Sequence, residues 1–247
     1  MKGLRAFLVV AALTVAVGLV FGLLPQIDLD AAHLFGTTQT GFVMRLNGIA
    51  LIMRQVGLWL PILVAVGCLL TLLAPLINPF VKTMVDSRSL IAIALTFALG
   101  PGLLVNVVLK DNWHRPRPMQ ITEFGGTSDF KAWWDTSGAC PYNCSFVSGE
   151  VAGATAVVAA AALVPAAYAG SALIAAIIFA VVIAFMRMAF GGHFLSDVIM
   201  AALFTELIAI ALMTLFHAPC WRYGRPGVLE EDIRNIGFRL RARTARL

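Results

Sequence analysis

Apolar runs about 20 residues long recur along this chain, and they constrain its fold more than any other feature. A helix needs roughly 20 apolar residues to cross a bilayer. Six runs qualify, at about 4–24, 57–77, 89–109, 149–166, 171–190 and 194–216. Of the 247 residues only 13% are charged, against about 25% in soluble domains. The sequence therefore predicts an all-α, six-helix transmembrane bundle that forms a single integral-membrane domain over residues 1–247.

Basic residues at both ends of the chain predict its orientation. Lys2 and Arg5 precede the first run, and seven arginines follow Ala218 in a basic tail at about 218–247. Because basic residues beside a span favour the cytoplasmic side, both termini are expected in the cytoplasm. The first run exceeds a signal-peptide core of about 7–15 residues, so we expect it to be retained. The connections at about 25–56, 110–148 and 191–193 then face outward.

Two interpretations of the basic tail remain open. Ile233, Ile236 and Leu240 recur at helical spacing among the arginines. This pattern fits a helix that lies on anionic lipid and equally a solvated basic segment. Binding to nucleic acid is not expected, because no folded soluble module accompanies the charge.

Cys140 and Cys144 lie in a long connection expected to face an oxidising compartment. Two cysteines four residues apart in such a place favour a small disulfide. A metal site is disfavoured, because no histidine or further cysteine stands nearby at ligand spacing. A disulfide here would stiffen the approach to Ser148.

Three polar clusters interrupt the apolar background, and all three adjoin the outward connections. They read KDNWHRPRP at 110–118, SGE at 148–150 and RMAFGGHFLSD at 187–197. Basic residues on an outward loop oppose the usual charge bias of membrane proteins, and an anionic ligand explains them. Ser148 is a good N-cap for a helix that begins near Gly149, where free amide groups favour anions. The alternative is capping alone, with Glu150 complementing the helix dipole.

The third cluster holds a histidine and a carboxylate four residues apart. On a helix His193 and Asp197 would share one face. A carboxylate that keeps one imidazole nitrogen as N–H leaves the other nitrogen free as a base or nucleophile. With the cations and an acid, these groups suit phosphoryl transfer. No carboxylate set resembles a two-metal site, so the reaction is expected to need neither metal nor cofactor.

Taken in order, the three clusters resemble the three-part signature of the type 2 phosphatidic acid phosphatase (PAP2) superfamily, over about residues 89–200. The resemblance implies that His193 forms a phosphohistidine and that Asp197 orients it. The residues that it assigns to phosphate binding are Lys110, Arg117, Ser148, Gly149 and Arg187. His114 and Arg115 lie near the site but are not signature positions.

The second part of the signature departs from the family. The family has proline, serine, glycine and histidine where this chain has Val147-Ser148-Gly149-Glu150, and that histidine protonates the leaving group. Repulsion by a phosphate dianion and desolvation would both favour a protonated glutamate. Such a glutamate could donate to the leaving oxygen and later deprotonate water, so Glu150 is expected to be catalytic.

The resemblance further implies a multi-pass protein of the bacterial inner (cytoplasmic) membrane with a periplasmic active site and a phosphorylated membrane lipid as substrate. The Ser-Gly-Glu form is similar to bacterial relatives that remove the 1- or 4′-phosphate of lipid A, which is the expected substrate. Undecaprenyl diphosphate and phosphatidylglycerol phosphate are alternative substrates. A lipid phosphotransferase and a noncatalytic lipid-binding or transport protein also remain open.

Overall fold

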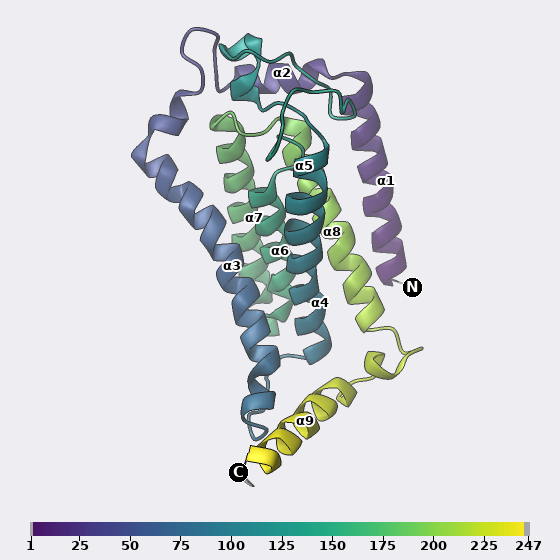
Figure 1. Cartoon of the computed structure of the whole chain (residues 1–247). Helices are drawn as coiled ribbons and strands as arrows, with labels where there is room; N and C mark the ends of the chain where they lie inside the picture. Colours follow the sequence, from purple (N-terminus) through teal and green to yellow (C-terminus); the bar gives the residue numbers. More distant parts are fainter. Residues whose placement is uncertain (1, 245–247) are drawn as a thin grey trace.

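The computed structural model describes residues 2–244, and within this range it is helical, with no β-strand (Figure 1). Residues 1 and 245–247, at the ends of the predicted domain and basic tail, lie outside it. Five helices of the described range are long and apolar enough to cross a membrane. They are α1 (Lys2–Leu23), α3 (Gly48–Ile77), the segment Ser87–Asn112, α7 (Ala166–Ala189) and α8 (Leu195–Phe216). The all-α fold and its apolar spans agree with the sequence prediction.

The run at 149–166 forms a shorter helix at the centre of the bundle. Helix α6 covers Gly149–Ala160 and ends in one 3-10 turn, η5 (Ala161–Leu163). The helix stops before Pro165, since the residue that precedes a proline disfavours helical geometry. Residues 151–156 are all buried, and α6 contacts α3, α4, α7 and α8. This segment is shorter than a typical span, so the predicted count of six crossings remains a prediction.

The third apolar run is a continuous helical segment with a widened middle. Helix α4 (Ser87–Phe97) passes into the π-helix η2 (Ala98–Leu109), which leads to α5 (Lys110–Asn112). Pro101 lies in the π-helical part. Because proline has no N–H to donate and its ring crowds the preceding turn, a regular α-helix is disfavoured there. The segment ends at the polar end of the bundle and presents Lys110 there.

Short helices and loops cover that end of the bundle (Figure 1). The short elements are α2 (Gln26–His33), η1 (Val43–Leu46), η3 (Pro118–Gln120) and η4 (Thr122–Phe124). Gly191 turns the chain between α7 and α8 with a positive φ of 63°, which glycine adopts without strain. A side chain at this position would also overlap the Phe42 ring. The tight turn places His193 directly after it.

The basic tail forms η6 (Arg222–Gly224) and α9 (Val228–Thr244) beside the opposite end of the bundle (Figure 1). The Phe238 ring packs against Phe80 near the end of α3. A Glu230 carboxylate oxygen accepts a hydrogen bond of 2.7 Å from the Ser87 amide at the start of α4. The tail is therefore helical and attached to the bundle, and its contact with anionic lipid remains a prediction.

Candidate active site

The predicted residues come from four parts of the chain and meet at the covered end of the bundle. Lys110 follows the last apolar residue of the Ser87–Asn112 segment. Ser148–Glu150 lie at the start of α6. Arg187 lies in the last turn of α7, and His193 precedes α8. Lys110, Arg117 and Arg187 all lie close enough to His193 for their charges to act on its imidazole ring. The fold therefore brings the three sequence clusters into one site.

His193 is buried, with 2% of its surface exposed. Its Nδ1 lies 2.6 Å from the backbone carbonyl oxygen of Ser145. A carbonyl oxygen only accepts, so Nδ1 carries the hydrogen and Nε2 keeps its lone pair. Burial lowers the pKa of His193 well below its usual range, and the neighbouring cations lower it further. The ring is therefore held neutral, in the form that a nucleophile requires.

His193 and Asp197 lie close together as expected, but they do not share a helix. Helix α8 begins at Leu195, with Phe194 as its N-cap, so His193 lies outside the helix. The Asp197 carboxylate turns back to accept the Phe194 amide at 2.9 Å. It lies 3.9 Å from His193 Nδ1, whose hydrogen bond goes to the Ser145 carbonyl. Asp197 instead accepts a hydrogen bond of 2.5 Å from the Ser145 hydroxyl. Ser145 therefore connects Asp197 to His193, because its carbonyl binds the imidazole ring.

Ser148 caps α6 as predicted, since its hydroxyl accepts from the Val151 amide at 3.4 Å. Gly149 provides space for two polar side chains. A Cβ atom at this position would lie 2.7 Å from Asn106 Oδ1 and 3.1 Å from Lys110 Nζ. Asn106 was missed by the sequence analysis, although an amide within an apolar run four residues before Lys110 is a usable signal.

Glu150, in the first turn of α6, lies between two arginines. Its Oε1 is 3.3 Å from a terminal nitrogen of Arg187 and 3.5 Å from Nε of Arg54. Arg54 belongs to α3 and was not predicted from the sequence. Its place in an outward connection, three residues before the second apolar run, was the available signal, because a basic residue there opposes the usual charge bias. Within residues 2–244, Nε of Arg187 and Oε2 of Glu150 are buried and have no hydrogen-bond partner. A ligand oxygen could satisfy the arginine donor, and a ligand hydroxyl the glutamate acceptor.

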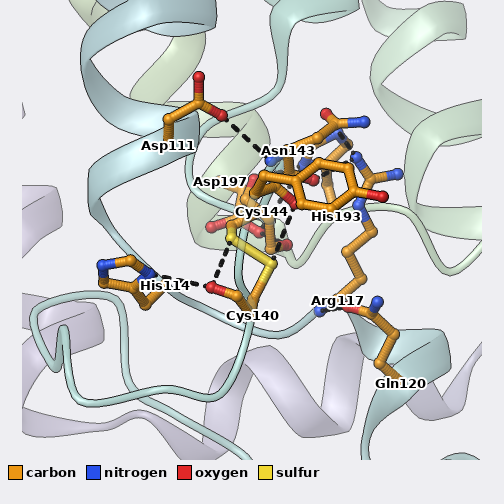
Figure 2. The surroundings of a disulfide bond; sticks show 11 residues. Asp111, His114, Arg117, Gln120, Cys140, Asn143, Cys144, His193 and Asp197 are labelled. Atoms are coloured by element: carbon orange, nitrogen blue, oxygen red, sulfur yellow. Dashed lines mark hydrogen bonds and ion pairs between the residues drawn. A yellow bond between two sulfur atoms is a disulfide. The ribbon is translucent and has the colours of Figure 1, made fainter.

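Arg117 is held by the loop that the two cysteines close (Figure 2). Cys140 and Cys144 form a disulfide, as the sequence favours. Between them, Asn143 accepts hydrogen bonds from Arg117 through its backbone and side-chain oxygens, at 2.7 and 2.9 Å. Burial lowers the pKa of Arg117, and the charge of Arg54 lowers it further. Arg117 still carries its charge at neutral pH, so the disulfide loop steadies one of the predicted phosphate ligands.

An apolar cavity of about 360 Å³ adjoins these charged groups. Its walls come from α3, from the Ser87–Asn112 segment and from α6, and they include Leu58, Ile62 and Phe97. Lys110, Gly149 and Glu150 also line it. A molecule with an anionic group and an apolar chain could occupy both regions together. Among the described residues, no three His, Cys, Asp or Glu side chains are grouped as metal ligands.

A neutral, buried histidine beside several cations, at one end of a membrane bundle, defines a membrane enzyme of phosphoryl transfer. A family model described as the PAP2 superfamily matches residues 90–220. The chain belongs to the PAP2 superfamily, and it is a phosphoric monoester hydrolase. The motif resemblance is thereby confirmed at the level of the family.

Relatives similar to this chain extend the match beyond that region. A protein of Rhizobium leguminosarum named lipid A 4′-phosphatase is 37% identical over 191 residues, which are 76% of this chain and 81% of the relative. A protein of Francisella tularensis subsp. novicida with the same name is 30% identical over 199 residues, 80% of this chain and 89% of the relative. No solved structure matches the chain.

The depressed pKa of His193 can be measured by NMR on protein labelled with ¹⁵N-histidine. Because the pKa of the folded protein lies below the usual value of about 6.5, the neutral ring should persist as the pH falls through that value. The denatured protein should titrate near about 6.5 and serves as the control. A His193→Gln variant assigns the signal. A midpoint at or above the denatured value would contradict this account.

Gly149→Ala should weaken the binding of inorganic phosphate about 10-fold or more, because its methyl group would displace Asn106 and Lys110. The dissociation constant can be measured by isothermal titration calorimetry. Gly170→Ala is the matched control, since a Cβ atom there meets nothing within 4 Å. Equal phosphate affinity in the two variants would show that the close approach at Gly149 is not needed.

Proposed function

We propose that this protein is a lipid A 4′-phosphatase that transfers the phosphoryl group first to His193 and then to water. The observation that carries the proposal is the pair of unpartnered atoms in the site. Arg187 Nε is a buried donor suited to a phosphate oxygen. Glu150, which pairs with the same arginine through Oε1, keeps Oε2 as a buried acceptor for a leaving hydroxyl or a water. Relatives named lipid A 4′-phosphatase over most of this chain support the choice of substrate.

In the first half-reaction, Nε2 of His193 attacks phosphorus as the bond from phosphorus to the 4′-oxygen breaks. Lys110, Arg117 and Arg187 bind the phosphoryl oxygens and stabilise the charge that shifts onto them. Ser148 and the Gly149 amide supply further hydrogen bonds at the start of α6. Glu150 gives its proton to the leaving oxygen, so the lipid departs as an alcohol.

In the second half-reaction, water attacks the phosphohistidine and the bond from phosphorus to nitrogen breaks. Glu150 takes the proton from this water, which restores its acid form. Inorganic phosphate leaves, and His193 returns to the neutral state with its Nδ1 hydrogen on the Ser145 carbonyl. Asp197 orients the ring indirectly, through its hydrogen bond with the Ser145 hydroxyl.

Glu150 forms its ion pairs with Arg54 and Arg187 in the site without substrate. A phosphate that binds Arg187 competes with Glu150 for the same guanidinium group. The bound phosphate also places negative charge next to the carboxylate, which favours its protonated form. Substrate binding thus converts Glu150 from an ion-pair partner into an acid.

The apolar cavity supports a lipid rather than a soluble substrate. Its walls, formed largely by α3 and the Ser87–Asn112 segment, are apolar and continue directly from Lys110 and Glu150. An acyl chain could remain in this cavity, or in the surrounding lipid, while the head group reaches the cations. The substrate would then enter from the side, without leaving the membrane.

The orientation in the membrane is part of the proposal. We place the protein in the bacterial inner membrane with six crossings, both termini in the cytoplasm and the site at the periplasmic face. The bias of basic residues toward Lys2, Arg5 and the tail supports this orientation. We also treat residues 1–247 as one domain, with a core at about 89–200 that the family match at 90–220 overlaps.

The purified protein in lipid nanodiscs should release inorganic phosphate from lipid A, and mass spectrometry should show loss of the 4′-phosphate. His193→Ala should abolish release, because it removes the nucleophile. His217→Ala, at the other end of α8, is the matched control and should retain activity. Undecaprenyl diphosphate and phosphatidylglycerol phosphate are tested in parallel. Faster release from either lipid would overturn the choice of substrate, and a phosphorylated acceptor without free phosphate would indicate a transferase.

Glu150→Gln should lower kcat on lipid A about 100-fold to 10,000-fold, because glutamine can neither donate nor accept the proton. An aryl phosphate needs little protonation of its leaving group, so the variant should release one equivalent of phenol rapidly. Turnover should then stop at the phosphohistidine, because no base activates the water. Glu123→Gln, outside the site in η4, is the control. Near wild-type turnover of Glu150→Gln across the pH range would remove Glu150 from the mechanism.

A further inference from the structure

A second set of charged residues lies behind the catalytic histidine. Arg115 is fully buried, and its guanidinium group joins two carboxylates that are also fully buried. One terminal nitrogen lies 2.7 Å from an Asp28 oxygen, and the other lies 2.5 Å from an Asp197 oxygen. Asp28 belongs to α2, and Asp197 to the first turn of α8. Arg115 therefore connects a short covering helix to the residues around His193.

Ser196 completes the connection between α2 and α8. Its amide donates to one Asp28 oxygen at 2.8 Å, and its hydroxyl donates to the other at 2.6 Å. The same hydroxyl accepts from Arg115 at 2.8 Å. Asp28 thus holds the start of α8 directly through two hydrogen bonds from Ser196, and indirectly through its ion pair with Arg115.

The network reaches His193 through Ser145. Asp197 accepts the Ser145 hydroxyl, and the Ser145 carbonyl accepts the Nδ1 hydrogen of His193. The Ser145 amide also donates to the Arg115 carbonyl at 2.9 Å. A shift of Arg115 would therefore move Asp197, which binds the Ser145 hydroxyl, and also the Ser145 backbone. The carbonyl oxygen of that backbone sets the direction of the His193 ring.

Buried charges of this kind are a poor means of stabilising a fold. Well-packed apolar residues of similar size are often equal or better, because burial removes each charge from water. A network of charges behind a reactive group serves more readily to hold that group in one direction. Asp28 also lies outside the matched family region at 90–220, and it is not one of the residues of the three-part signature.

We propose that Asp28 is a positioning residue for the phosphoryl-transfer reaction, acting on His193 through Arg115, Asp197 and Ser145. The inference rests on the proposed function. Asp28 contacts none of the residues proposed to bind phosphate, and these residues lie in parts of the chain other than α2. Loss of its charge should therefore slow the attack by His193 while leaving the binding of phosphate unchanged.

The test compares Asp28→Asn with wild type in single-turnover reactions on lipid A, with enzyme in saturating excess. Under these conditions the rate constant does not depend on what fraction of the enzyme is folded. We expect this rate constant to fall about 100-fold, with an unchanged dissociation constant for inorganic phosphate. Asp30→Asn is the matched control, because Asp30 is exposed on the same helix and, among residues 2–244, its side chain is hydrogen-bonded only to Gln26. An Asp28→Asn rate equal to that of Asp30→Asn would overturn the proposal.

Ser145→Ala provides a second route if Asp28→Asn does not fold. It removes the hydroxyl that links Asp197 to the Ser145 backbone and keeps the carbonyl that binds His193. A similar loss in the single-turnover rate, again with unchanged phosphate affinity, would support the network, and a wild-type rate would refute it. A wild type that releases no phosphate from lipid A would refute the proposed function itself, so the two failures are distinguishable.

Discussion

The ion pairs of Arg115 hold together the end of the bundle where the site lies. A guanidinium group that is removed from water must have anionic partners, or its burial is very costly. Asp28 and Asp197 supply them from two different helices. The position of α2, the path of the chain through Arg115 and the start of α8 are therefore mutually dependent. The direction of the His193 ring follows from the same set of contacts.

The same physical requirement explains the departure of this chain from its family at Glu150. The site gathers Lys110, Arg117 and Arg187, and Arg54 adds a further positive charge from α3. A carboxylate among these cations is stabilised before substrate arrives, as its ion pairs with Arg54 and Arg187 show. A neutral histidine at this position would remove the ion-pair partner of Arg54 and Arg187. The glutamate and the additional arginine are therefore best understood together.

Much of the fold and of the candidate site could be predicted from the sequence, since apolar runs and polar clusters are local features. The N-cap at Ser148 and the disulfide between Cys140 and Cys144 depend on neighbouring residues, and both were predicted. The length of α6 was overestimated, because Pro165 ends it early. His193 and Asp197 lie near each other as predicted, but the prediction that they share a helix was wrong, because α8 begins only at Leu195. The Nδ1 hydrogen bond of His193 goes to the Ser145 carbonyl and not to Asp197.

By itself, the sequence determined that this is a helical membrane protein with cations, a histidine and an acid beside its spans. Composition and spacing suffice for that, because the bilayer tolerates few structures and few reactions need this set of groups. Only the tertiary structure decided which partner each charged group has. Asp197 meets Arg115 and Ser145, and Glu150 meets Arg54. Such contacts act over about 3 Å between residues distant in the chain, so no local pattern specifies them.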